Sequence, residues 1–344
     1  MNSTNRPNSS NSSKGKTGGM RQLTYSLAIN EALHLMMRRD KSVFLIGQGV
    51  KSPWYVGNTA NGLIEKFGPE RVIDTPVSEN AITGLAVGAA LVGMRPVVVH
   101  PRIDFMMYAM DPIINEAANW HYMFGGKSLV PLVIWGIINR GEEQAAQHSQ
   151  ALQALFAHIP GLKVVMPSNP YDAKGLMISA IEDDNPVIYI DDRWLYNLEG
   201  KVPKDIYSIP IGKGIVRKEG TDVTLVATSY MVIESLKASE YLEGGGIDVE
   251  VIDLRSIKPI DEALLFKSIK KTGRLVIADG GWKTCGVAAE ISALISENIF
   301  EYLKAPILRV TLPDAPAPAS SILEKDYYPT SERIVKSIKG IIRK

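Results

Sequence analysis

The chain has 344 residues, enough for two domains that each bury a core. Its 38 lysines and arginines nearly balance 37 aspartates and glutamates, so there is no global basic field and we expect no nucleic-acid partner. The single cysteine, Cys285, excludes an intrachain disulfide and a cysteine cluster for zinc or iron–sulfur, and it favours a reducing, cytoplasmic compartment. The most continuous apolar run, 81–93, is shorter than the roughly 20 residues that span a bilayer, so we expect a buried helix and no membrane partner.

Residues 1–19 are mostly Asn, Ser, Gly and Lys and lack the apolar segment of a signal peptide, which predicts a disordered tail. From there on, short runs rich in Val and Ile alternate with amphipathic stretches, a pattern typical of strand–helix–strand units on a parallel sheet. The expected strands are 43–47, 72–74, 96–100, 132–137, 163–166 and 187–190. The expected helices are 25–38, 81–92, 106–123, 150–158 and 170–182. Such a sheet should be covered by helices on both faces.

The alternation stops after residue 191 and resumes at residue 223, which predicts a domain boundary near 203–209. The second half has expected strands at 223–227, 249–254, 275–278 and 307–311, and expected helices at 230–242, 262–271, 287–299 and 331–342. The proline-rich stretch 313–318 predicts an extended connector to the last helix. We therefore expect an α/β protein of two doubly wound domains, 20–205 and 206–344.

The segment 74–80, Asp-Thr-Pro-Val-Ser-Glu-Asn, is the first candidate for chemistry. It leaves a predicted strand and enters a predicted helix, so Glu79 should lie near the carboxyl end of a strand, where open parallel sheets bind ligands. Ser78 and Glu79 also fit a simple helix cap, which is the commoner role for such residues. The chain has no G-x-x-x-x-G-K-[ST] loop and no G-x-G-x-x-G after a strand, so a ligand must be held in another way.

Together with Gly-Leu-Ala-Val-Gly-Ala-Ala at 84–90, this segment resembles the pyrimidine-binding segment of transketolase-like enzymes. The resemblance is closest to β subunits of thiamine-diphosphate-dependent 2-oxoacid dehydrogenases, and it runs from about residue 21 to the C-terminus. It implies a pyrimidine-binding domain followed by a transketolase C-terminal-like domain. It also implies that Glu79 bonds a pyrimidine nitrogen of thiamine diphosphate, where a shared proton activates the cofactor for attack on a 2-keto carbon.

Two further segments resemble the same family. Asp104-Phe105, followed by 110–118, implies that Phe105 packs against the pyrimidine ring, although a lone Phe is usually a core residue. Ala-Gln-His-Ser-Gln at 146–150 places His148 at the family's active-site histidine, which stabilises covalent adducts or relays a proton. Without the resemblance, His148 is better interpreted as a loop residue that caps the next helix. No role is expected for the other histidines, which are His34, His100, His121 and His158.

A structural potassium ion is implied by the resemblance as well. Its ligands would be carbonyl and side-chain oxygens of Leu132, Ala180, Ile181, Asp183 and Asn185. Taken alone, Glu-Asp-Asp-Asn at the end of a helix is more often a solvated turn.

The cofactor's diphosphate needs magnesium, which this superfamily holds with a Gly-Asp-Gly motif and a downstream Asn. The chain has no such motif, so the resemblance implies an α subunit that supplies the diphosphate and Mg²⁺ site within an α2β2 heterotetramer. In this family the C-terminal domain mediates dimerisation and, in multienzyme complexes, docking of a lipoyl acyltransferase.

The expected function is decarboxylation of a 2-oxoacid with transfer of the acyl unit to lipoamide, by a β subunit that is active only with its α subunit. Two segments depart from the family: Gln48 and Pro53-Trp54-Tyr55 replace an acidic residue and a Gly-Gly pair, and the loop 139–144 is more acidic than usual. These departures leave open a two-subunit transketolase-like transferase that passes a ketol or acyl unit to a carbonyl acceptor. A non-catalytic scaffold is the third hypothesis, and the joint presence of Glu79, Phe105 and His148 argues against it.

Overall fold

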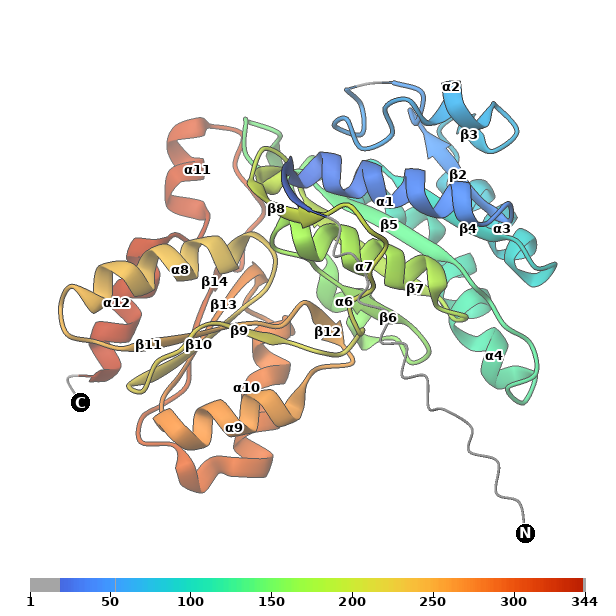
Figure 1. Cartoon of the computed structure of the whole chain (residues 1–344). Coiled ribbons are helices and arrows are strands. Elements are labelled where there is room, and N and C mark those ends of the chain that lie inside the picture. The colour runs from blue at the N-terminus through green and yellow to red at the C-terminus, as the bar shows by residue number, and fades with distance from the viewer. Residues whose placement is uncertain (1–18, 53, 343–344) are drawn as a thin grey trace, which may run out of the picture.

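A seven-stranded sheet organises the first half of the chain (Figure 1). The computed structural model describes residues 19–52 and 54–342, so most of the expected N-terminal tail and Pro53 lie outside the described residues. The strand order is β12-β6-β7-β5-β4-β2-β3, and every neighbouring pair is parallel except β12 with β6. The strands are β2 (Val43–Gln48), β3 (Val72–Thr75), β4 (Arg95–His100), β5 (Val133–Ile138), β6 (Lys163–Val165), β7 (Val187–Asp192) and β12 (Ser256–Lys258).

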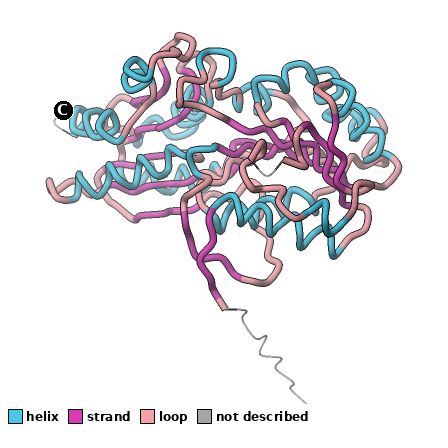
Figure 2. The backbone as a smooth tube through the Cα atoms, turned by 90° about the horizontal axis from the view of Figure 1, so that it is seen from above, coloured by secondary structure: helices cyan, strands magenta, loops and turns pink. Residues whose placement is uncertain are grey.

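Helices cover both faces of this sheet, as the buried strands predicted. Phe44 and Ile46 of β2 pack into one hydrophobic cluster, whereas Val43 and Leu45 pack into another on the opposite face. Figure 2 shows the strands between helices above and below them. The helices of this half are α1 (Tyr25–Arg39), α2 (Leu63–Phe67), α3 (Glu79–Leu91), α4 (Asn119–Met123), α5 (Ala145–His148), α6 (Gln153–His158) and α7 (Pro170–Glu182).

A second sheet of five strands, in the order β14-β13-β10-β11-β9, organises the C-terminal half, and β9 is its one antiparallel strand. Its strands are β9 (Ile215–Lys218), β10 (Val223–Ala227), β11 (Val249–Asp253), β13 (Leu275–Trp282) and β14 (Leu308–Leu312). Its helices are α8 (Tyr230–Glu243), α9 (Glu262–Thr272), α10 (Val287–Ile299), α11 (Ser321–Tyr327) and α12 (Ser331–Ile342). The expected fold class, two α/β units in tandem, is confirmed.

The short elements α2, α5, β9 and β12 were not expected from the sequence, and the structure also differs from the predictions in the following segments. The single helix expected over 106–123 is instead a 3-10 segment (Ile103–Ala109), a π-helical segment (Asp111–Ala118) and α4. Pro112, at the start of the second segment, has no N–H to continue a regular ladder. The proline-rich connector leads to α11 rather than directly to the last helix, and an antiparallel pair, β1 (Met20–Thr24) with β8 (Glu199–Pro203), was not expected.

Buried charges join the two halves. Asp172 of α7 forms ion pairs with Arg217 of β9 and with Arg255, whose Nη2 lies 2.7 Å from Oδ1 of Asp172. Arg217 also pairs with Asp253 at 2.8 Å. Because Asp172 and Asp253 are fully buried, these pairs fix how the second half sits against the first. Within the described residues, no helix is long and apolar enough to cross a membrane.

Candidate active site

Glu79 lies in the first turn of α3, immediately after the short connector that follows β3. This is the carboxyl end of a parallel strand, as the sequence predicted. Ser78 occupies the N-cap position and Glu79 the first turn, as the capping interpretation expects, but the Ser78 side chain makes no capping hydrogen bond. The Glu79 side chain is half-buried and has neither a hydrogen bond nor an ion pair to any described residue. Its carboxylate is therefore available to a ligand.

A small pocket opens beside Glu79, where the carboxyl ends of β2 and β4 meet the start of α3. Its lining consists of Gln48, Tyr55, Ser78, Glu79, Ile82, Val99, His100, Pro101, Arg102 and Phe105. Phe105, which the sequence singled out, thus shares a pocket with Glu79. The pocket combines one acidic side chain, one arginine and an aromatic ring, a combination that can orient a polar heterocycle.

His148 lies next to this pocket, in contact with Phe105. It lies at the end of the short helix α5, and its ring meets the Phe105 ring edge-on, with centroids 5.4 Å apart and planes at 86°. The His148 side chain is half-buried and hydrogen-bonds to none of the described residues. The structure therefore brings the three predicted residues together from segments far apart in the sequence.

Asp104 holds the His148 loop in place, a role that sequence reasoning missed. Its carboxylate is buried, and Oδ1 accepts a hydrogen bond of 3.0 Å from the backbone N–H of Gln150. Burial raises the pKa of Asp104, and this hydrogen bond acts in the opposite direction. Because Asp104 precedes Phe105, one carboxylate fixes the distance between the Phe105 turn and the His148 loop. The available signal was an acidic residue directly beside the predicted aromatic contact.

His100, at the end of β4, is a second residue whose place was not expected. It is fully buried, and burial lowers its pKa to about 4, so the ring is neutral at physiological pH. Its Nε2 lies 3.1 Å from Oγ1 of Thr83, one turn after Glu79. This contact fixes the start of α3 against β4, and its sequence signal was a polar residue at the carboxyl end of a strand.

Gln48 and Tyr55, from the first segment that departs from the expected sequence pattern, line the pocket. Gln48 Nε2 donates a hydrogen bond of 2.6 Å to the hydroxyl of Tyr55. The Tyr55 ring covers Gly49, where an added Cβ would lie 2.2 Å from a ring carbon and where φ is +72°. Glycine is therefore required at position 49, both for space and for backbone conformation. The unusual Gln48 and Tyr55 are thus one unit that lines the site.

The second departure, the acidic loop at 139–144, contacts α11. The N–H of Glu143 donates to Oε2 of Glu324 at 3.3 Å, and the N–H of Ser321 donates to Oε1 of Glu143 at 3.1 Å. Glu142 and Glu143 have φ of +53° and +60°, a left-handed conformation that non-glycine residues rarely adopt. Packing against α11 holds this strained loop beside the His148 segment.

The residues expected to bind potassium meet near the end of α7, but other cations already contact them. The carbonyl oxygens of Ile181 and Asp183 accept hydrogen bonds of 2.9 and 3.1 Å from Arg95. Lys163 Nζ lies 2.5 Å from the Asp183 carboxylate. An ion here would face two positive side chains, so these oxygens as arranged do not fit it. The remaining members are near this turn. Ala180 is buried in the last turn of α7, the Leu132 carbonyl accepts from the N–H of Val187 at 2.9 Å, and Asn185 donates its N–H to Asp183 at 2.9 Å.

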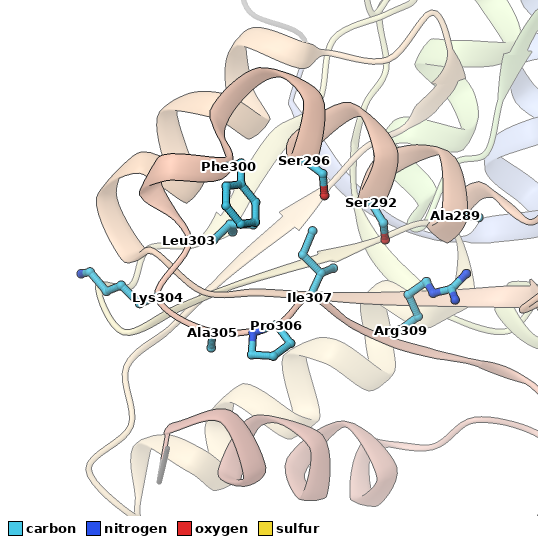
Figure 3. Close-up of a pocket in the computed structure, with 10 residues that line it drawn as sticks. All are labelled: Ala289, Ser292, Ser296, Phe300, Leu303, Lys304, Ala305, Pro306, Ile307 and Arg309. Carbon is cyan, nitrogen blue, oxygen red and sulfur yellow. The ribbon is translucent and has the colours of Figure 1, made fainter.

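A wider hollow lies far from this chemistry, between α10 and the start of β14 (Figure 3). Its polar lining residues are Ser292, Ser296, Lys304 and Arg309. It has no carboxylate and no histidine, so it lacks the groups for acid–base catalysis near neutral pH. The pocket at Glu79 is therefore the better candidate for an active site.

Comparison with known families agrees with this geometry. Residues 21–198 match the family described as transketolase, pyrimidine binding domain, and residues 212–334 match transketolase, C-terminal domain. The chain therefore belongs to the transketolase family. The Glu79 pocket lies within the first matched domain.

Within this family the chain is similar to proteins named as β subunits, which confirms the expected resemblance. It is 44% identical over 327 residues to the acetoin:2,6-dichlorophenolindophenol oxidoreductase subunit beta of Bacillus subtilis (strain 168), with 92% of this chain and 96% of that protein covered. It is 43% identical over 320 residues to the pyruvate dehydrogenase E1 component subunit beta of Rickettsia felis, with 93% and 98% covered. A solved structure described as "Split gene transketolase, inactive beta4 tetramer" shares the fold, with a TM-score of 0.76, 24% identity and coverage of 93% and 98%.

Proposed function

We propose that the chain is the β subunit of a thiamine-diphosphate-dependent 2-oxoacid dehydrogenase and provides the pyrimidine half of its active site. The observation that carries the proposal is the Glu79 carboxylate, which has no partner among the described residues and shares a pocket with Phe105. The named β subunits at 43–44% identity support the reaction class.

When bound, thiamine diphosphate supplies the carbon nucleophile that attacks the 2-keto carbon of the substrate. In this proposal Glu79 shares a proton with a pyrimidine nitrogen, and Phe105 orients the ring by stacking. His148, whose ring contacts Phe105, transfers or holds a proton near the reacting carbonyl. Asp104 keeps His148 in place through the N–H of Gln150.

The diphosphate and magnesium ligands come from an α subunit in this proposal, because the chain has no phosphate-binding loop and no Gly-Asp-Gly motif. The assembly proposed is an α2β2 heterotetramer in the cytoplasm, with a lipoyl acyltransferase as the acyl acceptor. The proposal includes no potassium ion, because the oxygens expected to bind it do not fit it as arranged. Since Arg95 and Lys163 already neutralise that turn, no step of the reaction is assigned to the ion.

A two-subunit transketolase-like transferase is the second candidate, and the Gln48–Tyr55 unit favours it because it changes the lining of the pocket itself. Both candidates need Glu79. The non-catalytic scaffold has less support, since Glu79, Phe105 and His148 lie close together although they come from segments far apart in the sequence.

The deciding experiment co-expresses the chain with a matching α subunit and supplies thiamine diphosphate and Mg²⁺. Reduction of 2,6-dichlorophenolindophenol that depends on a 2-oxoacid supports the dehydrogenase. Carbon–carbon bond formation without dye reduction supports the transferase instead. If neither occurs and the Glu79→Ala complex binds the cofactor as the wild type does, the scaffold is correct.

A further inference from the structure

Arg102 places a guanidinium in the same pocket as Glu79 and Phe105. It lies between the end of β4 and the 3-10 segment that carries Phe105, and it is half-buried. Its hydrogen bonds go to neutral oxygens: the Pro101 carbonyl at 3.2 Å and the side chain of Gln144 at 3.3 Å. The Asn139 amide oxygen, in the orientation that satisfies both groups, lies 2.9 Å from Nη2.

No carboxylate among the described residues forms an ion pair with Arg102. Burial lowers the pKa of Arg102, and the nearby positive charge of Arg193 lowers it further, while Tyr55 and Asp104 act in the opposite direction. Arg193 itself donates to the Tyr55 carbonyl and also has no carboxylate within ion-pair distance in the described chain. A partly buried arginine without an acidic partner is uncommon, because its charge has lost water without gaining a counter-charge.

The rest of the pocket lining does not supply that counter-charge. Gln48, which also lines the pocket, is neutral and hydrogen-bonds to Tyr55. Asp104, which is not part of the pocket lining, is buried, directs Oδ1 to the N–H of Gln150 and forms no ion pair with Arg102. Arg102 therefore gives the pocket a partly buried positive charge that no described carboxylate pairs, and its N–H groups donate only to neutral oxygens that a carboxylate can replace.

We propose that Arg102 binds the carboxylate of an anionic 2-oxoacid substrate and thereby selects anionic over neutral acyl donors. The inference rests on the proposed function, since it assigns a substrate class to that same pocket. Guanidinium and carboxylate are matched in geometry, and their hydrogen bonds are about twice as strong as neutral ones. The neutral Gln48 adds no negative charge that would repel the same substrate.

A purely structural role for Arg102 makes a different prediction. Its contacts with Asn139 and Gln144 also tie the acidic loop to the pocket, so a structural arginine would affect every substrate alike. A substrate-binding arginine affects the anionic donor only. Comparison of one anionic and one neutral donor therefore separates the two roles.

The test uses the complex of the chain with its α subunit, loaded with thiamine diphosphate and Mg²⁺, in the wild type and as Arg102→Met, Arg102→Lys and Arg38→Met. Arg38 is an exposed arginine of α1 and serves as the matched control. Pyruvate is the anionic donor, acetoin the neutral donor, and oxamate, an unreactive isostere of pyruvate, is titrated by calorimetry.

Arg102→Met should raise the KM for pyruvate and the Kd for oxamate by roughly 10- to 100-fold, as expected for a lost hydrogen bond to a charged group, and leave the acetoin KM within about twofold. Arg102→Lys should recover part of the oxamate affinity, and Arg38→Met should match the wild type. Equal losses for both donors, or an unchanged oxamate Kd in Arg102→Met, would overturn the inference. If the wild type turns over neither donor, the proposed function fails, while oxamate binding still decides whether Arg102 recognises a carboxylate.

Discussion

Replacement of Glu79 by Gln removes one ionisable oxygen and preserves the shape of the side chain. The structure predicts a small change in stability, because the Glu79 side chain is half-buried and has no hydrogen bond or ion pair within the described chain. What is lost is the favourable placement of a negative charge in the first turn of α3, about 0.3–1 kcal/mol. The fold should therefore survive the substitution.

Activity should respond far more strongly. If Glu79 shares a proton with the pyrimidine, its loss removes an acid–base contribution of about 10²- to 10⁴-fold in rate. That range corresponds to about 3–5 kcal/mol of activation free energy, several times the expected change in folding free energy. A loss of activation free energy much larger than the loss of folding free energy distinguishes a catalytic carboxylate from one that only stabilises the start of a helix.

The assay is kcat for dye reduction by the α–β complex, together with urea unfolding of each variant. The matched control is Glu262→Gln, since Glu262 lies in the first turn of α9 and is exposed. The control should show a similar small loss of stability and normal activity. A Glu79→Gln complex that keeps more than about a tenth of wild-type kcat would refute the reasoning.

Three more predictions concern single sites. His148→Asn should lower kcat by about 10²-fold or more and leave the melting temperature nearly unchanged. His158 is exposed, and the control His158→Asn should change neither kcat nor the melting temperature. Equal kcat values for the two variants would rule out a proton role for His148. Burial raises the pKa of Asp191 to about 7, so the folded state holds its proton more tightly than the unfolded state. The wild type should therefore lose stability relative to Asp191→Asn, on the order of a few kcal/mol, as the pH rises from about 4 to about 7, and a pH-independent difference in urea unfolding would contradict this. Because Arg95 and Lys163 already neutralise the turn after α7, potassium chloride and sodium chloride should give the same melting temperature within about 1 °C; a rise specific to potassium would instead support the ion site.

Strands and helices with a clear pattern of apolar residues could be predicted from the sequence, and their alternating order indicated the fold class. α7 starts at Asn169-Pro170 as expected, because the Asn side chain accepts from the N–H of Asp172 and Pro170 needs no donor. The prediction of one regular helix over 106–123 was wrong, because apolar periodicity alone does not show how a proline and its neighbours alter the backbone hydrogen bonds of a helix. The β1–β8 pair was missed because it joins segments at the two ends of the first domain.

The residues of the candidate site likewise fall into those that a local motif indicates and those that only a long-range contact defines. Glu79, Phe105 and His148 stand in recognisable local motifs, so the sequence identified them. The roles of Asp104 and Arg102 were not predicted, because they depend on contacts with Gln150 and Gln144, more than 40 positions away along the chain. A contact of that range has no local sequence pattern.

In the function proposed above, this chain supplies only the pyrimidine half of a thiamine-diphosphate site. Calorimetric titration of thiamine diphosphate with Mg²⁺ into the isolated chain and into the α–β complex tests it most directly. Binding should be at least about 100-fold tighter in the complex, because the diphosphate and metal ligands come from the partner, and Glu79→Gln should weaken it there. Equally tight binding by the isolated chain would contradict the account.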